Sequence, residues 1–577
     1  MIELLALAKI EKKKIFLMIF FLFFLGLFEI LSLSALIPIL QLVLNEEVFF
    51  NSKYYLIIKD YTSFFGEFGS EKNLYFFLIL LCIIFFIKNL GMILLTHLNN
   101  VIIIGIETKL SIELFKKYIS SPIIFLSRKS SSEIIRNVIS QSSMYANSFI
   151  FSLVLIVTEI FTFSIILIFL FIVNPQETLY AVIIFISISI FYVLFFKKTV
   201  INLSQSSENS FERRIRYLNY GIDSAKEIKL YDLKEKFINE YLIDSYKMMR
   251  NLKIISLIRV FPRHFFEVIA VMLLSIFIII STKNQLASEL VISKIAIFAY
   301  AGFRILPSLN RTLTNINRFK ISLPIAKNLI NEFKHFNNFN IEIALDKKLK
   351  IKDFDEFLDF RINGLKFKYP DAKEPIFEKL DFSFKSGSSN FIYGDSGSGK
   401  TTLIEIIIGL IQIDEKKIFV NNQDFNNIKN EWQSIVSYVP QNIFIMNDSL
   451  RNNIIGNTDL EFRSEDYLNA IKLADLQNLE KTLKDKNIGE KGKKLSSGQI
   501  KRIGIARAIY KKNAKVLIFD EATDNLDTVS EIEVIEKIIN LKNKYTIIFV
   551  SHNITLSKYF NNVFKLEKKL LTIKNAK

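Results

Sequence analysis

The chain has 577 residues, of which 50% are hydrophobic and 55 are phenylalanine, and it carries a formal net charge of +17. This length and apolar content indicate several domains, at least one of them embedded in lipid. One cysteine, Cys82, and four histidines exclude a disulfide framework and argue against a Cys- or His-rich metal centre. Nucleic-acid binding explains the charge less well than membrane topology does, because the basic residues flank apolar stretches instead of forming one block.

Six apolar stretches of membrane length come first in the chain. Each reaches the roughly 20 residues that a helix needs to cross a bilayer. No small-residue cleavage site follows the first stretch, so we expect a retained membrane helix and not a signal peptide. The sequence therefore predicts an all-α polytopic membrane domain over residues 1–325, with spans near residues 15–44, 74–104, 149–173, 179–200, 260–282 and 290–309.

Basic residues concentrate in two long loops, residues 105–148 and 201–259. The positive-inside rule then places these loops and both termini in the cytoplasm. Helical periodicity in both loops predicts stalks, with short transverse helices near residues 120–129 and 220–227; plain polar loops are the alternative. The outer loop, residues 45–73, is rich in aromatic residues and predicts either an interfacial amphipathic segment or a packed surface loop.

Four cations lie within or at the ends of the apolar stretches: Lys88, Arg263, Arg304 and Arg311. Ionisable residues there are costly unless they face a partner or a cavity. One interpretation is internal ion pairs with the nearby acids Glu29, Glu159 and Glu267. The other is a basic cavity for an anionic substrate, most simply a phosphate or pyrophosphate.

A charged linker, residues 326–357, precedes a second domain over residues 358–577, where the hydrophobic period changes to that of strands. A strand ending at Tyr393 runs into a G-x-x-x-x-G-K-T loop and then an apolar helix. The glycines and the helix N-terminus expose backbone N–H groups to a phosphate chain. We expect Lys400 to reach the β- and γ-phosphates and Thr401 to ligate Mg²⁺. The predicted cradle comprises Gly394, Ser396, Gly397, Ser398, Gly399, Lys400, Thr401 and Thr402.

Further polar residues follow predicted strands. Asp520 and Glu521 end a buried strand, where Asp520 would hold Mg²⁺ and Glu521 would polarise the attacking water. His552 follows the next buried strand and would contact the γ-phosphate, and Gln441 would ligate Mg²⁺ or water. Tyr369 is a candidate for stacking on adenine, with a simple sheet residue as the alternative. A second phosphate cradle is predicted at a helix N-terminus formed by Ser496, Ser497, Gly498 and Gln499.

The order of phosphate loop, Gln441, Leu-Ser-Ser-Gly-Gln, Asp-Glu strand and His552 resembles the nucleotide-binding domain of an ABC transporter. Together with the six stretches it resembles an exporter-type half-transporter. The resemblance implies an α/β P-loop fold, ATP and Mg²⁺ as cofactors, and a homodimer. In that dimer Ser496 and Gly498 would serve the partner's ATP. The chain departs from the family at Ser497, where glycine is usual, and at Ile500, Asp524, Asn525 and Asn553. None of these changes removes a group that hydrolysis needs.

The positions of Lys88, Arg263, Arg304 and Arg311, with the aromatic outer loop, resemble the bacterial PglK-type flippases. That resemblance implies alternating-access transport of a polyprenyl-pyrophosphate-linked oligosaccharide across the bacterial cytoplasmic membrane. A lipid A-type flippase and an exporter of drugs or peptides are the alternatives. Two other classes fit less well. The six stretches argue against a non-transporting ATPase, and Glu521 and His552 argue against a regulator that binds ATP without turnover.

Overall fold

The computed structural model describes residues 12–35, 39, 42–43, 70–173, 175–283, 288–338, 357–370, 372–413, 415–456, 462–483, 486–524, 528–567 and 570–575. The chain divides into two compact units. Unit 1 comprises Met1–Ser121 and Leu126–Ala344, and unit 2 comprises Pro122–Phe125 and Leu345–Lys577. Residues 44–69, which hold most of the predicted outer loop, lie outside the described residues.

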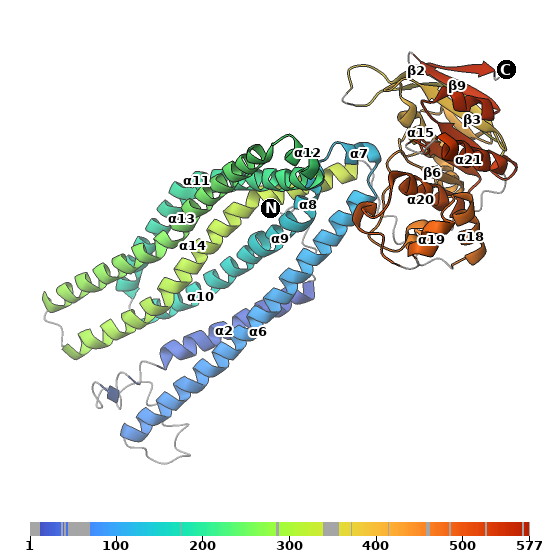
Figure 1. Cartoon of the computed structure of the whole chain (residues 1–577). Helices are drawn as coiled ribbons and strands as arrows, with labels where there is room; N and C mark the ends of the chain where they lie inside the picture. The colour runs from blue at the N-terminus through green and yellow to red at the C-terminus, as the bar shows by residue number, and fades with distance from the viewer. Residues whose placement is uncertain are drawn as a thin grey trace. The chain divides into compact units, whose positions relative to one another are not determined.

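The described part of the chain up to residue 338 is helical, as predicted (Figure 1). Its long helices are α2 (Lys12–Ser34), α6 (Ser70–Ile119), α10 (Phe151–Val173), α11 (Pro175–Asp223), α13 (Lys234–Lys283) and α14 (Ser288–Asn338). Shorter pieces are α7 (Ile123–Ser127), α8 (Ser131–Ile135), α9 (Ser142–Met144) and α12 (Ala225–Leu230), with π-helical turns η2 (Arg136–Gln141) and η3 (Tyr145–Ile150). The short helices α7 and α12 lie at or next to the positions predicted for transverse helices.

Three helices within the described residues are long and apolar enough to cross a membrane: Leu74–Ile119, Ser131–Ile172 and Thr178–Asp223. A shorter apolar helix, Phe20–Ser32, lies in the first predicted stretch. The last two predicted stretches lie in α13 and α14, which also carry many polar residues. The helical membrane architecture is therefore confirmed, whereas the count of six spans stays a prediction.

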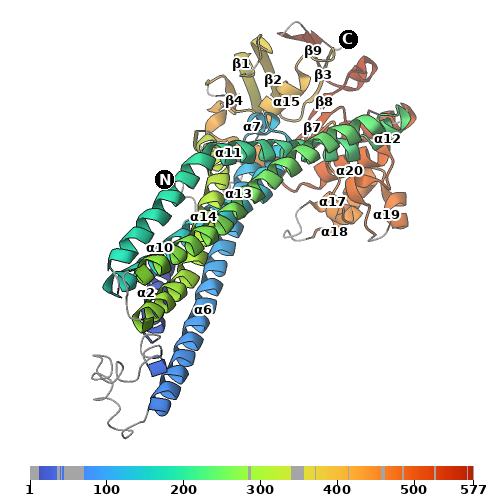
Figure 2. The ribbon, with the colours of Figure 1, turned by 90° about the vertical axis from the view of Figure 1, so that its left-hand side faces the viewer.

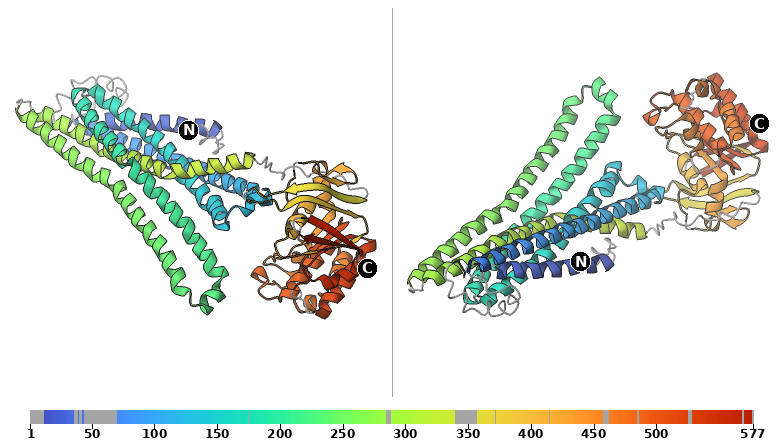
Figure 3. Two further views of the ribbon diagram at one scale, coloured as in Figure 1. Left: turned by 90° about the horizontal axis from the view of Figure 1, so that it is seen from above. Right: turned by 90° about the horizontal axis from the view of Figure 1, so that it is seen from below.

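Helices α11 and α13 form a long hairpin that α12 helps to close (Figures 1 and 2). Arg213 of α11 and Asp244 of α13 tie the hairpin together, with the guanidinium Nε donating to the carboxylate at 2.8 Å. Away from its closed end, the hydroxyl of Tyr192 donates to the backbone oxygen of Ile258 at 2.5 Å. Towards α12 the pair diverges from α10 and α14 (Figure 3).

Unit 2 contains two sheets. The larger has the order β10-β9-β3-β8-β7-β6, in which β9, β3, β8, β7 and β6 run parallel. The smaller is antiparallel, with the order β2-β1-β4-β5. The strands are β1 (Asp359–Phe367), β2 (Phe377–Lys385), β3 (Ser389–Gly394), β4 (Ile418–Val420), β5 (Gln423–Asp424), β6 (Val436–Val439), β7 (Val516–Asp520), β8 (Thr546–Val550), β9 (Asn562–Glu567) and β10 (Leu570–Asn575).

The parallel core explains the sequence pattern of the soluble half. Strands β7 and β8 are buried at every position, which suits uninterrupted apolar runs covered on both faces. The helices are α15 (Lys400–Ile408), α16 (Lys429–Ile435), α17 (Leu450–Ile455), α18 (Ser464–Leu473), α19 (Gln477–Leu483), α20 (Ser497–Tyr510) and α21 (Thr528–Ile539). Short 3-10 turns lie at Phe425–Asn427, Glu490–Gly492, Asn540–Asn543 and Ile554–Tyr559.

Strand register brings the predicted site residues to one edge. Ile392 of β3 pairs with Val550 of β8, and Val550 pairs with Asp520 of β7. The carboxyl ends of these three strands therefore meet, as they do at ligand sites of open α/β sheets. Of the predicted linker, residues 326–338 continue α14 and residues 339–356 lie outside the described part.

Candidate nucleotide-binding site

The phosphate loop has the backbone that its glycines allow. Gly397 and Gly399 have φ angles of +78° and +101°, in the left-handed region that favours glycine. A Cβ on Gly394 would lie 2.4 Å from the backbone oxygen of Leu566, so no other residue fits there. The ammonium of Lys400 donates to the carbonyl oxygens of Gly394 at 2.8 Å and Asp395 at 3.0 Å, and thereby lies over the loop.

A cavity of about 440 Å³ within unit 2 joins this loop to Gln441, Glu521 and His552, whereas Asp520 and Tyr369 do not line it. It is lined by Ile376, Ser396, Gly397, Gly399, Lys400, Thr401, Thr402, Gln441, Glu521 and His552. The buried hydroxyl oxygen of Ser398, in the same loop, has no hydrogen-bond partner within the described structure. Donors on the loop, an ammonium and an unsatisfied hydroxyl are what a polyphosphate requires, so the residues present fit ATP.

Asp520 ends β7 and is almost fully buried. Burial raises the pKa of its carboxyl group to about 6, although a hydrogen bond from the Tyr438 hydroxyl, at 3.3 Å, acts in the opposite direction. Oxygen ligands suit Mg²⁺, and a bound cation would favour the ionised carboxylate. Asp520 therefore fits the cation-binding role predicted for it, with Thr401 and Gln441 lining the cavity.

Glu521 lines the cavity next to two other polar side chains, those of Gln441 and His552. The Gln441 amide donates to its carboxylate, and His552 Nδ1 lies 4.0 Å from its Oε1. The backbone N–H of Glu521 donates to the backbone oxygen of Val550 at 2.9 Å. The φ angle of Glu521 is +50°, which is unusual for a residue other than glycine. Such strained backbone is common where a side chain must be aimed at a reaction. Asp524, a departure from the family pattern, lies 3.7 Å from His552 Nδ1.

Lys501 also contributes to the site, although it lies outside the predicted sequence motifs. Its side chain is only 7% exposed, and its ammonium donates to the backbone oxygens of Gln441 at 2.6 Å and Glu521 at 2.9 Å. Burial lowers its pKa, and the carboxylates of Asp524, Glu521 and Asp520 oppose that shift. Helical spacing gives a signal, because residues 501, 505 and 508 share one face of α20 and Ile505 and Ala508 are buried.

The predicted second phosphate cradle lies at the N-terminus of α20. Ser496 caps the helix: its hydroxyl accepts from the Gln499 N–H, and the Gln499 side chain accepts from the Ser496 N–H. Ser497 is the first helical residue and has no positive φ, so the helix accommodates serine where the family usually has glycine. These residues do not line the 440 Å³ cavity.

Tyr369 lies next to the phosphate-loop helix. Its hydroxyl is 3.3 Å from Thr402 Oγ1 and 3.4 Å from Glu405 Oε2, and its ring meets Phe367 edge to face. The ring is half-buried, and adenine stacking stays a prediction. Among the other departures, Asn553 caps the turn that follows it, Ile500 packs against the core, and Asn525 lies outside the described residues.

The predicted substrate cations differ in their surroundings. Arg311 pairs with Glu159, which also accepts from the Ser308 hydroxyl at 2.6 Å, and exposed Arg263 pairs with Glu267 at 3.2 Å. Lys88 is buried, with its ammonium 5.0 Å from the ring centre of Phe85. The side chains of Arg304 and Glu29 lie outside the described residues. Ion pairing, one of the two interpretations of these cations, thus applies to Arg263 and Arg311.

Family models match both the helical half and the α/β half of the chain. Residues 15–305 match the model of the ABC transporter transmembrane region, and residues 377–524 match that of the ABC transporter. An ATP-dependent lipid A-core flippase from Francisella tularensis is 26% identical over 456 residues, 77% of this chain and 72% of that protein. A second such flippase, from Colwellia psychrerythraea, is 26% identical over 49% of this chain and 52% of its own length.

The chain is also similar to a protein whose name describes lactococcin transport and to a solved exporter structure. A lactococcin-G-processing and transport ATP-binding protein from Lactococcus lactis is 30% identical over 45% of this chain and 37% of its own length. The chain thus spans about half the length of the Colwellia psychrerythraea flippase. The structure of a bacterial Atm1-family ABC exporter with ATP bound has a TM-score of 0.75 at 16% identity, covering 98% of this chain and 96% of that one.

The fold, the order of the motifs and the family matches agree. One helical transmembrane region precedes one α/β nucleotide-binding domain, and the exporter structure shares this fold over nearly the whole chain. The chain belongs to the ABC transporters, as a half-transporter of the exporter type.

Proposed function

We propose that the chain hydrolyses ATP and uses it to move an anionic lipid across the bacterial cytoplasmic membrane by alternating access. The observation that carries the proposal is the 440 Å³ cavity, in which the phosphate loop, Gln441, Glu521 and His552 face one space. A site that only bound nucleotide would not need a carboxylate base beside a histidine at the phosphate end. The arrangement therefore favours hydrolysis over binding alone.

Each residue has a distinct part in the proposed reaction. The loop N–H groups and Lys400 orient the phosphate chain, and Glu521 accepts a proton from the attacking water. His552 would hydrogen-bond the terminal phosphate, and Tyr369 would position the adenine. Mg²⁺ held by Thr401, Gln441 and Asp520 would neutralise charge on the phosphates. Lys501 donates to the backbone oxygens of both Gln441 and Glu521 and so holds the two segments together.

A homodimer would complete each site. Ser496, Ser497, Gly498 and Gln499 form the N-terminal turn of α20, where the capping box occupies the N–H groups of Ser496 and Gln499, and they lie outside the cavity of their own chain. A helix N-terminus favours anions, so this cap is suited to the phosphate of a nucleotide bound by a second copy. This supports two identical chains, with each ATP held by the phosphate loop of one and the Leu-Ser-Ser-Gly-Gln segment of the other.

The proposed substrate is a polyprenyl-pyrophosphate-linked oligosaccharide. A pyrophosphate can pair with several cations, and arginine binds it through parallel hydrogen bonds, which gives Lys88, Arg263, Arg304 and Arg311 a shared purpose. A lipid A-type lipid is a second candidate, favoured by the flippase names of the relatives. An exporter of drugs or peptides is the third, favoured by the lactococcin transporter. All three place a multi-pass protein in the inner membrane, with its nucleotide-binding domain in the cytoplasm.

Reconstitution distinguishes these candidates. Purified protein in proteoliposomes is supplied with ATP and, in parallel, a labelled polyprenyl-pyrophosphate glycan, a labelled lipid A, a cationic drug and a peptide. We expect ATP-dependent translocation of the glycan lipid and stimulation of phosphate release by it. Movement of the lipid A, drug or peptide without movement of the glycan lipid would replace the proposed substrate with that compound. Absence of phosphate release under all conditions would contradict the ATPase itself.

A further inference from the structure

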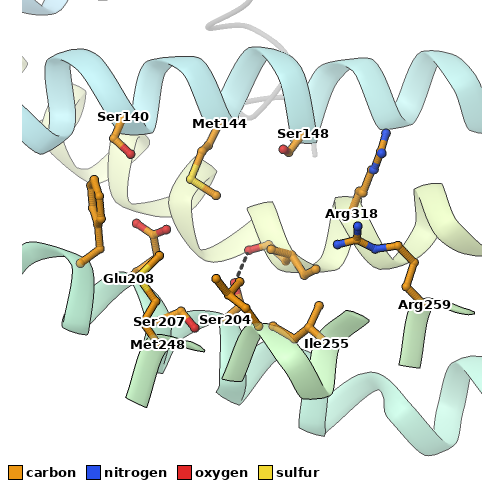
Figure 4. Close-up of a pocket in the computed structure, with 13 residues that line it drawn as sticks. Ser140, Met144, Ser148, Ser204, Ser207, Glu208, Met248, Ile255, Arg259 and Arg318 are labelled. Carbon is orange, nitrogen blue, oxygen red and sulfur yellow. Dashed lines mark hydrogen bonds between the residues drawn. The ribbon is translucent and has the colours of Figure 1, made fainter. Parts of the chain in front are cut away.

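Unit 1 contains a cavity of about 310 Å³ that no predicted site residue lines (Figure 4). Its volume is at the lower end of the roughly 300–1,000 Å³ typical of small-molecule sites. The lining comes from α11, α13, α14 and the helix that contains the π-helical turns η2 and η3. The lining residues are Ser140, Met144, Ser148, Ser204, Ser207, Glu208, Phe211, Met248, Leu252, Ile255, Arg259, Arg318 and Ile321.

Two arginines give the cavity a charged end. Arg259 comes from α13 and Arg318 from α14, and Glu208 lies at the opposite end in Figure 4. The Nε of Arg259 is buried and has no hydrogen-bond partner within the described structure. A buried guanidinium N–H without a partner is costly unless a ligand accepts from it. Between the two ends, Met144, Met248 and Ile255 contribute apolar wall.

Both arginines lie at the same level of the helix bundle. The hydroxyl of Tyr192 donates to the backbone oxygen of Ile258 at 2.5 Å and accepts from the Asn317 amide at 2.8 Å. Arg259 and Arg318 are the next residues in their helices. Lys320 reaches the same level, because its ammonium donates to the backbone oxygen of Val193 at 3.0 Å.

This level coincides with one end of the apolar run of α11, the end that the positive-inside rule places in the cytoplasm. The apolar run of α11 ends at Lys197 and Lys198, one to two turns beyond Tyr192. No aspartate or glutamate occurs in residues 178–207, 245–266 or 290–331, the parts of the three helices that flank this level. Lys197, Lys198, Arg259, Arg318 and Lys320 thus form a basic collar, defined by these five cations. Collars of this kind at the cytoplasmic face attract anionic lipid.

We propose that Arg259 and Arg318 bind the phosphate group of an anionic phospholipid from the cytoplasmic leaflet. Arginine can hold a phosphate through parallel hydrogen bonds, and the apolar wall suits the hydrocarbon next to the lipid's head group. Glu208 lies at the other end of the cavity, away from the two arginines, so the arginine end is the one suited to an anion. The site differs from the proposed substrate cations and does not depend on ATP hydrolysis.

Native mass spectrometry of the full-length protein in detergent tests this directly. The probes are phosphatidylglycerol, phosphatidylcholine and inorganic phosphate. We expect the wild type to retain phosphatidylglycerol in preference to phosphatidylcholine, and Arg259→Gln with Arg318→Gln to weaken its affinity about tenfold or more. The matched control, Arg250→Gln with Lys253→Gln, removes two exposed cations of α13 that do not line the cavity and should bind as the wild type does.

Three outcomes would overturn the proposal. An equal loss of phosphatidylglycerol affinity in the control variant would attribute the effect to general surface charge. Unchanged affinity in the variant that lacks Arg259 and Arg318 would show that these arginines do not bind the lipid. Equal binding of inorganic phosphate would show that no lipid is recognised. Arg259→Lys guards against misfolding, because it keeps the charge while losing the planar fork. We expect it to retain a folded chain and to bind phosphatidylglycerol more weakly than the wild type.

Discussion

The ammonium of Lys501 donates a hydrogen bond to the backbone oxygen of Glu521 at 2.9 Å, and not to its carboxylate. The same ammonium bonds the backbone of Gln441 at 2.6 Å. Lysine thus fixes the two segments that carry the proposed base and cation ligand while leaving both side chains free to act. Because Lys501 belongs to α20, whose N-terminus would serve the partner's nucleotide, it also links the two ATP sites of the proposed dimer through one helix.

Replacing Lys501 tests this positioning role. Lys501→Met keeps the length of the buried chain but removes the ammonium, leaving two backbone oxygens without their donor. We expect kcat for ATP hydrolysis to fall about tenfold or more, since each hydrogen bond from a charged group contributes roughly 1.5–3 kcal/mol. The KM for ATP should change little, because Lys501 does not line the nucleotide cavity.

Controls for Lys501 separate positioning from folding. Lys512→Met removes an exposed lysine just after the same helix and should leave turnover as in the wild type. Lys501→Arg retains a charged donor and should recover part of kcat. If the Lys501→Met variant raised KM as much as it lowered kcat, Lys501 would support nucleotide binding in general and not the position of Glu521.

Glu521→Gln removes the proposed base while keeping the size of the side chain. We expect ATP binding to persist and hydrolysis to fall by at least about 10²-fold, the lower range for a general base. Phosphate release and nucleotide binding are measured on the same preparation. Asp524→Asn, which alters the neighbouring carboxylate near His552, should retain far more activity. Near wild-type turnover in Glu521→Gln would remove Glu521 from this role.

The raised pKa of Asp520 predicts a pH dependence of cation binding. Burial favours the neutral carboxyl group, so the nucleotide-free fold loses stability as the pH rises from 3.8, the ordinary pKa of aspartate, to about 6. Below about pH 6 a proton competes with Mg²⁺ for this carboxyl group. We therefore expect the Kd for Mg²⁺ to rise as the pH falls through about 6. Titrations at pH 5.5, 6.5 and 7.5 measure it, with Asp520→Asn as the control. An equal pH dependence in that variant would assign the proton to the nucleotide.

Features that a local sequence motif encodes were predicted better than contacts between residues far apart in the chain. The phosphate loop, the Asp520–Glu521 pair and His552 all follow strands, and parallel pairing brings them to one edge, so pattern alone placed them correctly relative to the sheet. Lys501 was missed because a lysine on a helix usually faces solvent, although its spacing from Ile505 and Ala508 places it on the buried face of α20. The sequence offered Glu159 as an ion-pair partner but did not say of which cation, because Glu159 and Arg311 are 152 residues apart.

The dimer has a direct test in cysteine crosslinking. Cys82 is exposed and is replaced first, and single cysteines are then placed at Ser396 in the phosphate loop and at Ser497 at the start of α20. If each nucleotide lies between two chains, ATP should promote a disulfide that joins two full-length chains. Denaturing electrophoresis without reductant shows the product. Crosslinks formed only within single chains, with or without ATP, would contradict the dimer.

The ion pair between Arg311 and Glu159 separates a structural from a substrate role. Glu159 is 8% exposed, so Arg311→Gln leaves a largely buried carboxylate without its cation, and we expect a lower melting temperature. Adding Glu159→Gln should restore much of that loss, because a neutral amide can still hydrogen-bond Ser308.

Transport by the Glu159→Gln, Arg311→Gln protein then gives the answer. If Arg311 also binds the pyrophosphate head group, the double variant regains stability yet remains unable to translocate the glycan lipid in proteoliposomes. Phosphate release by the same preparation reports whether the nucleotide-binding unit is assembled. Translocation at the wild-type rate would limit Arg311 to the ion pair and leave head-group binding to Lys88, Arg263 and Arg304. We expect the first result, because the Arg311 side chain is 58% exposed while it pairs with Glu159, which leaves part of its guanidinium open to a phosphate.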